Sequence, residues 1–65
     1  MSPKGLGTVI TKLRGHETQE ALARRAKVSR SYLAAIEAGH KKNPSLAILQ
    51  RLAKALRVPV AELLA

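Results

Sequence analysis

Residues 30–38 combine side chains that could recognise a hydrogen-bonding, negatively charged partner. If this segment is a helix that buries Leu33 and Ile36, steps of 100° per residue turn a smooth face outwards. That face carries Ser31, Ala34, Ala35 and Ala38, with Arg30 and Tyr32 at its flanks near the amino end. A guanidinium has two parallel donors that suit the O6 and N7 acceptors of guanine, a serine hydroxyl can hydrogen-bond to a base edge, and alanines can pack on a thymine methyl group. Contacts to base edges are therefore expected from Arg30, Ser31, Ala34 and Ala35.

Catalytic and metal-binding arrangements are not indicated. His16 and Glu17 are adjacent, but the sequence offers them no nucleophile as a partner. Two histidines, His16 and His40, in a chain without cysteine cannot close a zinc site by themselves. No glycine-rich phosphate loop follows a strand, because no strand is expected. We therefore expect no enzyme activity, no bound metal and no cofactor.

The charge of the chain indicates an acidic partner. Twelve Lys and Arg stand against four acidic residues, which gives a net charge of +8. Nucleic acid is the first interpretation and an anionic membrane surface the second. A membrane-surface peptide needs longer continuous amphipathic helices, whereas glycine or proline at 15, 39, 44 and 59 interrupts them. The chain has no cysteine, no apolar run near the ~20 residues of a membrane span and no apolar stretch in residues 1–7, so a cytoplasmic location is expected.

Hydrophobic spacing predicts an all-α fold of five short helices. Apolar residues recur at helical intervals, as in Leu6, Val9, Ile10 and Leu13. The expected helical segments are 6–14, 18–26, 30–38, 45–56 and 60–64, with threonine or serine caps at 18, 29 and 45. At 65 residues the chain makes at most one domain, 1–65, and its core must be aliphatic because the only aromatic residue is Tyr32.

Two of these helices have the spacing of a helix-turn-helix. In residues 18–39 they are separated by about three residues. Ala23 leaves room for two backbones to cross, and Val28 can fill the angle between the helices. In such a unit the second helix projects into the major groove of DNA. The helix-turn-helix is expected at about 18–38, with the recognition helix at about 30–38.

The same residues resemble the phage repressor and Cro-type family of helix-turn-helix regulators, also called the xenobiotic-response-element family. The matching segments are Thr18-Gln19-Glu20-Ala21-Leu22-Ala23, Val28-Ser29-Arg30-Ser31-Tyr32-Leu33-Ala34-Ala35-Ile36-Glu37-Ala38-Gly39, Asn43-Pro44-Ser45-Leu46, Leu49, Leu52-Ala53-Lys54-Ala55-Leu56 and Val58. Leu6-Gly7, Ile10 and Leu13-Arg14 fit the first helix of the family. The resemblance spans nearly the whole chain and implies a lambda-repressor-like bundle that binds double-stranded DNA.

The resemblance also implies roles for Gln19 and Glu37, and position and charge suggest roles for Tyr32 and the loop at 41–43. Gln19, at the start of the second helix, is expected to contact a phosphate and to brace the recognition helix. Glu37 is expected to pair with an arginine of the first helix; Arg14 matches by pattern and Lys12 by residue counting, and Arg14 is favoured. Tyr32 could stack in the core or reach a phosphate with its hydroxyl. The loop after the recognition helix would meet the DNA backbone, so phosphate contacts are expected from Lys41, Lys42 and Asn43.

Two positions depart from the family pattern. The family usually has glycine in the turn where this chain has Lys27. If Lys27 is left-handed there, roughly 1 kcal/mol of strain is expected. The connection between Arg14 and Thr18 is two residues shorter than usual, and Glu17 replaces the apolar residue that commonly precedes the cap.

Together these features predict a sequence-specific transcriptional regulator. One short recognition helix recognises only a few base pairs, so we expect a homodimer on an inverted repeat. The regulator could act as a repressor, an activator or both, and repression is favoured. Apolar residues at the carboxyl end, Val58, Val60, Leu63 and Leu64, are expected to supply the dimer surface through the C-terminal helix. The alternative is an antitoxin or another helical protein-interaction module with the same fold. Arg30 on a smooth face and the basic loop after it favour DNA binding.

Overall fold

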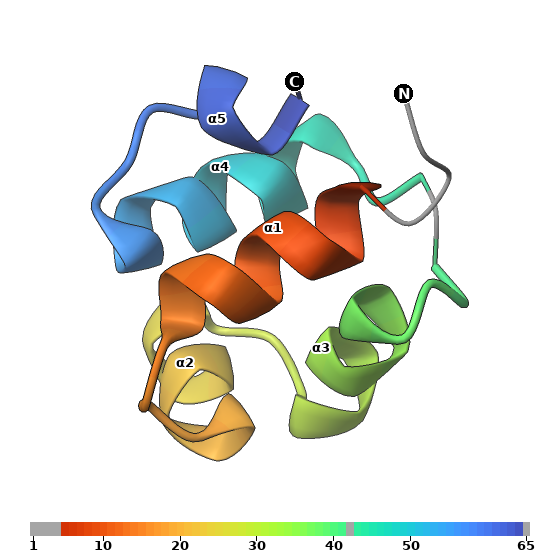
Figure 1. The fold of residues 1–65 in the computed structure, drawn as a ribbon, viewed down its shortest axis with the longest axis vertical. Helices are drawn as coiled ribbons and strands as arrows, with labels where there is room; N and C mark the ends of the chain where they lie inside the picture. Colours follow the sequence, from red (N-terminus) through yellow and green to blue (C-terminus); the bar gives the residue numbers. More distant parts are fainter. Residues whose placement is uncertain (1–4, 42, 65) are drawn as a thin grey trace.

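A computed structural model describes residues 5–41 and 43–64 of the chain. Its helices are α1 (Gly5–Arg14), α2 (Gln19–Ala26), α3 (Arg30–Glu37), α4 (Leu46–Leu56) and α5 (Ala61–Leu64), and the described residues contain no strand (Figure 1). The expected all-α bundle of five helices is therefore confirmed. The expected ends are displaced slightly: α3 stops at Glu37, because Ala38 is its C-cap, and α5 begins at Ala61.

Three hydroxyl side chains begin three of the helices. Thr18 accepts a hydrogen bond from the amide of Ala21, Ser29 from that of Tyr32, and Ser45 from that of Ile48. Each cap satisfies one of the amides that a helix leaves unpaired in its first turn, which stabilises the helix by about 1 kcal/mol. Local sequence therefore sets where α2, α3 and α4 begin.

The connection between α2 and α3 is held by a left-handed residue. Lys27 has φ 61° and ψ 41° and is the C-cap of α2. Its amide donates to the carbonyl of Arg24, and the amide of Val28 donates to the carbonyl of Ala23. These two bonds form a Schellman motif, which normally favours glycine at the left-handed position. The structure thus has lysine at the position where the sequence pattern predicted strain.

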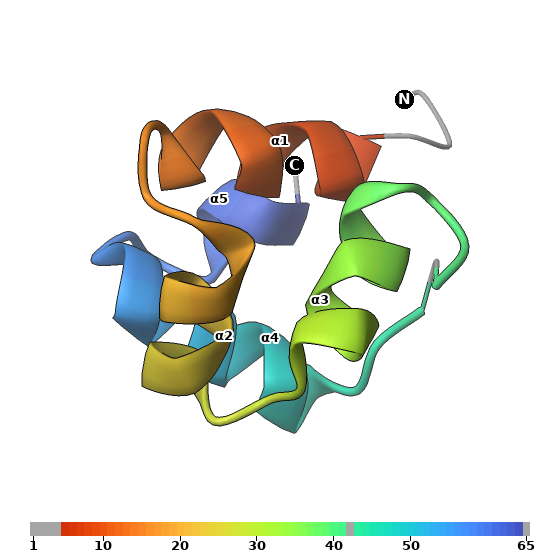
Figure 2. The ribbon, with the colours of Figure 1, turned by 90° about the horizontal axis from the view of Figure 1, so that it is seen from below.

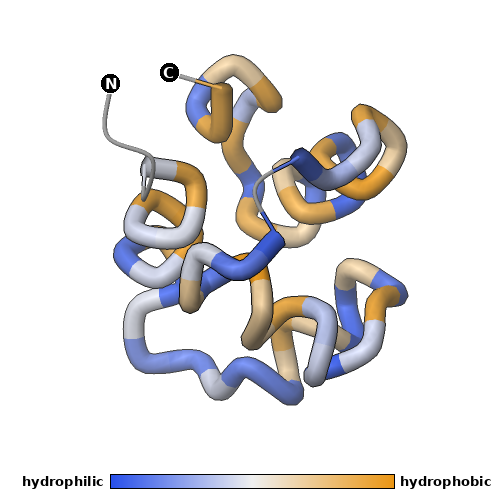
Figure 3. Tube along the Cα trace, turned by 90° about the vertical axis from the view of Figure 1, so that its right-hand side faces the viewer, coloured by the Kyte–Doolittle hydropathy of each residue, from blue (hydrophilic) through white to orange (hydrophobic). Residues whose placement is uncertain are grey.

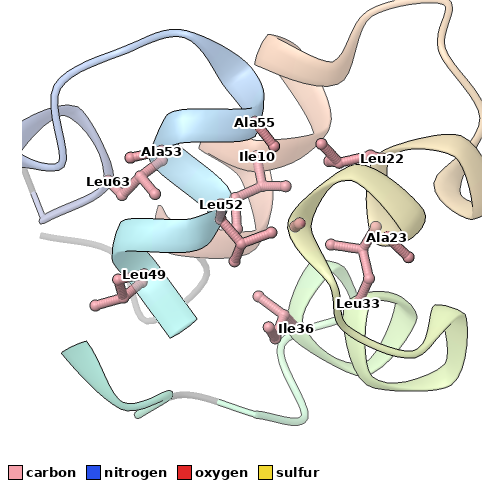
Figure 4. Packing of buried hydrophobic residues seen from close by; sticks show 11 residues of the cluster. Ile10, Leu22, Ala23, Leu33, Ile36, Leu49, Leu52, Ala53, Ala55 and Leu63 are labelled. Carbon is pink, nitrogen blue, oxygen red and sulfur yellow. The ribbon is translucent and has the colours of Figure 1, made fainter. Parts of the chain in front are cut away.

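An aliphatic core joins the helices. Ile10, Leu22, Leu33, Ile36 and Leu52 are fully buried and point towards one another from α1, α2, α3 and α4 (Figure 4). Along the helices the trace alternates between hydrophobic and hydrophilic stretches, as amphipathic helices require (Figure 3). Burial of each such side chain contributes about 1.5–3 kcal/mol to folding, so the core fixes the direction in which α3 presents its other face.

The carboxyl end is more buried than the sequence indicated. Leu63 is 3% exposed and belongs to the core, while Val58 and Val60 are partly buried against it. Leu63 was expected at a dimer surface, and that expectation is wrong because the short α5 needs this residue to pack against the rest of the domain. Leu64, at 56% exposed, is the large apolar side chain that this end presents to solvent.

Helices α2 and α3 occupy one side of the molecule. They lie beside each other at the bottom of Figure 1 and face the viewer in Figure 2, where α1 crosses above them. The turn through residues 27–29 joins the carboxyl end of α2 to the amino end of α3. The fold therefore presents the amino end of α3 next to a tight, internally bonded turn.

Candidate nucleic-acid interface

Helix α3 presents the outer face that its sequence predicts. Leu33 and Ile36 are 0% and 1% exposed, so they hold the inner face in the core. On the opposite side Arg30, Ser31 and Ala38 are exposed, whereas Ala34 and Ala35 are half-buried. The outer face therefore consists of one long cation and one hydroxyl at its amino end, followed by small methyl groups. A helix with such a low outer surface can approach another backbone closely.

The carboxyl end of α3 rests directly on α1. A Cβ atom placed on Gly7 would lie 2.6 Å from the carbonyl oxygen of Ile36 and 2.6 Å from that of Glu37. Contacts below 3.0 Å force something to move, and here the neighbours are backbone atoms with little freedom to do so. Gly7 is thus required by close helix packing, and it sets the distance between α1 and α3.

A hydrogen-bonded cluster fixes the same end of α3 from the other side. Arg14 donates from Nε to Oε2 of Glu37 and from Nη2 to Oε1 of Glu37, both at 2.9 Å. Gln19 donates from Nε2 to Oε1 of Glu37 at 2.8 Å. The side chains of Arg14 and Glu37 are 16% and 6% exposed. The cluster links the end of α1, the start of α2 and the end of α3. The partner of Glu37 in α1 is therefore Arg14, as the resemblance favoured, and not Lys12.

The charges in this cluster stabilise each other. Burial by itself raises the pKa of Glu37, but the hydrogen bonds from Arg14 and Gln19 and the positive charge of Arg14 outweigh burial, so the net pKa lies below its ordinary value. The hydrogen bond to Glu37 raises the pKa of Arg14 despite some desolvation. Glu37 is therefore an ionised carboxylate that is fully paired within this cluster.

Gln19 uses one of its two Nε2 hydrogens on Glu37, and no second acceptor for Nε2 is found in the described part of the chain. A carboxylate can only accept hydrogen bonds, so the amide of Gln19 must turn Nε2 towards Glu37. The second hydrogen on Nε2 is then directed away from Glu37. The residue lies in the first turn of α2, where the unpaired amides and the positive end of the helix dipole favour an anion.

The loop after α3 folds back towards that helix. Gly39, with φ 85°, donates its amide to Ile36, and the amides of His40 and Lys41 donate to the carbonyl of Ala35. Nζ of Lys41 lies 5.8 Å from the centre of the Tyr32 ring, within range of a cation–π contact. Tyr32 itself is half-buried against the core, and Asn43 is exposed. Lys42 lies outside the described residues.

The short connection before α2 is held by a pair that the sequence did not reveal. Arg25 donates from Nε to Oε2 of Glu17 at 3.0 Å and from Nη2 to Oε1 at 2.5 Å. Its Nη1 donates to the carbonyl of Ala55 at 2.6 Å. Arg14 also donates to the carbonyl of Glu17. An ion pair thus replaces the apolar contact that commonly precedes the cap. The only indication of this pair in the sequence is that residues of opposite charge, Glu17 and Arg25, are eight positions apart.

Comparison with known proteins supports the same interpretation of these elements. The family described as helix-turn-helix matches residues 17–63. The chain is also similar to the restriction-modification controller protein C.AhdI from Aeromonas hydrophila, at 33% identity over 94% of each chain and with a TM-score of 0.87. No protein with a curated function matches the chain, and no helix in residues 5–41 and 43–64 is long and apolar enough to cross a membrane. The chain belongs to the phage repressor and Cro-type helix-turn-helix family of DNA-binding transcriptional regulators.

Proposed function

We propose that the chain is a repressor that binds an inverted-repeat operator as a homodimer, with α3 in the major groove. The single observation that carries this proposal is the exposed amino end of α3, with Arg30 and Ser31 on a helix whose other end is fixed by Glu37. Occupying an operator blocks an overlapping promoter, which is why repression is the proposed outcome. A DNA partner also supports the cytoplasmic location expected from the sequence.

Base recognition is assigned to the outer face of α3. Arg30 is exposed at the first position of the helix, where a long side chain can extend to a guanine and donate to O6 and N7. Ser31 is exposed beside it and can bond to an adjacent base edge. Ala34 and Ala35 retain partly exposed methyl groups for thymine. Specificity would therefore be concentrated at the amino half of the helix.

Phosphate contacts are assigned to the two flanks of α3. The second Nε2 hydrogen of Gln19 can donate to a phosphate while the first remains bonded to Glu37, so this contact costs no rearrangement of the cluster. On the other flank, Lys41 is held beside Tyr32, and Asn43 is exposed two residues further on. The Tyr32 hydroxyl and Lys42 complete the proposed set. Such contacts would fix the orientation of the domain on the duplex.

A homodimer is supported by the number of base pairs that one helix can contact and by one exposed apolar side chain. A single recognition helix contacts too few base pairs to distinguish a site within a genome, and two copies on neighbouring half-sites double that number. Leu64, at the end of α5, is 56% exposed and offers an apolar contact for a second copy. We therefore propose the carboxyl end as the dimer contact, with Leu64 in place of the larger apolar set expected from the sequence.

The similarity to a restriction-modification controller supports a proposal about the regulated genes. That protein shares 33% identity and nearly the whole fold with this chain. We propose that this chain also controls restriction-modification genes. The decisive experiment is selection of bound sites from random duplex DNA. A palindromic site with half-sites about one helical turn apart supports the proposal, and its presence upstream of restriction-modification genes supports the assignment of target. Recovery of no preferred sequence would contradict sequence-specific binding.

A further inference from the structure

A hollow lies on the flank of α2 that faces away from α3. It has a volume of about 500 Å³ and is formed where the carboxyl ends of α2 and α4 meet. In Figure 2, α2 lies between α3 and the carboxyl end of α4. No residue of α3 is among those that line the hollow. DNA held by the outer face of α3 would therefore leave this hollow open to solvent.

The lining of the hollow is strongly basic. Its cationic side chains are Arg25, Lys27, Arg51, Lys54 and Arg57, all of them exposed. Arg25 is neutralised by Glu17. The other four have no carboxylate within ion-pair distance among the described residues. Four exposed cations around one hollow exceed what is needed to balance the partial negative charge, about half a unit each, at two helix carboxyl ends.

The floor of the hollow is apolar and lacks donors for a compact anion. Ala26 and Ala55 line it at 1% and 9% exposure. The nearby amides of Lys27 and Arg57 already donate to carbonyls of their own helices. Phosphate sites in proteins typically use free amides at helix amino ends, whereas here two helix carboxyl ends converge. The geometry thus disfavours a small phosphate at the floor and favours carboxylates bound at the rim by long side chains.

We propose that this basic hollow binds an acidic segment of a second protein, with apolar side chains on the Ala26–Ala55 floor and carboxylates at the cationic rim. Binding there is compatible with DNA on α3, since the two surfaces lie on opposite flanks of α2. Electrostatic attraction of this kind contributes mainly to association rate and selectivity, so the interaction is expected to be salt-sensitive.

The test is an amide-resolved NMR titration of the full chain with a synthetic peptide that alternates Glu and Leu. We expect chemical-shift changes at residues 25–27 and 51–57. Lys54→Glu should weaken binding by about three- to ten-fold, because repulsion replaces attraction at the rim. Lys12→Glu is the matched control: it makes the same change in net charge on an exposed helical position outside the hollow, and should have a much smaller effect. Thermal unfolding of both variants would confirm that each is folded.

Three results would overturn the proposal. They are shift changes confined to α3, an equal loss of peptide affinity in the two variants, and equal or stronger binding of inorganic phosphate at the hollow. Repeating the titration on the DNA-bound chain then tests simultaneous binding. The titration of the free chain does not depend on DNA binding, so failure of the operator proposal and failure of the hollow proposal are separately visible.

Discussion

Lys27 and Arg57 end α2 and α4 with the same backbone conformation, φ 61° and ψ 41° in both. In each case the residue donates its amide to a carbonyl three positions back, and the following valine donates to the carbonyl of an alanine at 3.0 Å. The two helices thus end in the same Schellman motif, with a basic residue at the position that favours glycine. This choice places cations at two helix carboxyl ends, where the dipole stabilises them.

Lys27→Gly should leave the free energy of unfolding unchanged or raise it by up to about 1 kcal/mol. Glycine relieves the left-handed strain in the folded state, which stabilises the protein. Its larger conformational freedom in the unfolded chain offsets part of this gain. Arg24→Gly is the control, because Arg24 lies within α2 and glycine there should cost about 1 kcal/mol. Urea denaturation of both variants is the measurement. A clear loss of stability in Lys27→Gly would mean that the lysine side chain contributes more than the turn geometry indicates.

Gly7→Ala should destabilise the protein by about 1–3 kcal/mol, since the new methyl group overlaps two carbonyl oxygens of α3. The sign of this change in stability is informative, because replacing glycine by alanine in an unobstructed helix stabilises it by about 1 kcal/mol. Thr8→Ala, at an exposed neighbouring position, is the control and should change stability by no more than about 0.5 kcal/mol. Increased stability of Gly7→Ala would show that α1 does not pack against α3 at this point.

Acid should weaken the fold through Glu37. Its pKa is lowered in the folded state, so the paired carboxylate stabilises the protein above the ordinary value of 4.5, and this contribution is lost as the pH falls through the lower folded pKa. Glu37→Gln should lower the free energy of unfolding at neutral pH by about 1–3 kcal/mol, because Arg14 loses its charged acceptor. The variant should also lose less stability than the parent protein when the pH is lowered, because it no longer has this carboxylate to protonate. Glu20→Gln is the control, since its pair with Arg24 is exposed and 3.4 Å long. The measurement is the melting temperature of each protein from pH 7 down into acid. If the melting temperature of Glu37→Gln falls with decreasing pH as steeply as that of the parent protein, this role of Glu37 is contradicted.

DNA affinity should fall steeply with salt. Lys41 and Lys42 are the cations in the proposed set of phosphate contacts, and the other members of that set are neutral. A dimer would therefore neutralise about four phosphates, and log K would fall against log salt with a slope of ~0.9 per phosphate neutralised. Lys41→Ala should lower the magnitude of this slope by about one for each phosphate that the lysine no longer neutralises. Fluorescence anisotropy from roughly 50 to 200 mM salt provides the measurement. Affinity that stays flat over this range would count against binding to phosphates.

Much of the fold was predictable because its signals are local. Caps at Thr18, Ser29 and Ser45 and the buried pair Leu33 and Ile36 follow from short-range spacing. These same signals identified the outer face of α3. Local spacing could not identify the partner of Glu37, because residue counting pointed to Lys12 and only the family resemblance favoured Arg14.

Contacts between distant segments could not be derived in this way. The carbonyl of Ala55 is 30 residues from Arg25, and no sequence period links them. Leu63 looked available for a partner because a four-residue helix gives too short a pattern to assign a buried face. The basic hollow likewise arises from two helix ends that only the tertiary fold brings together.

The central claim, that α3 recognises bases while its flanks hold the backbone, is tested most directly by comparing Arg30→Ala with Lys41→Ala. Each variant is titrated on the selected site, on its single-base variants and on random duplex. Arg30→Ala should cost ~1–3 kcal/mol on the best site, much less on random DNA, and relax the preference at one base pair in each half-site. Lys41→Ala should weaken all sequences about equally. If Arg30→Ala weakens every sequence by the same factor, Arg30 contacts a phosphate and the assignment of base recognition to it is wrong.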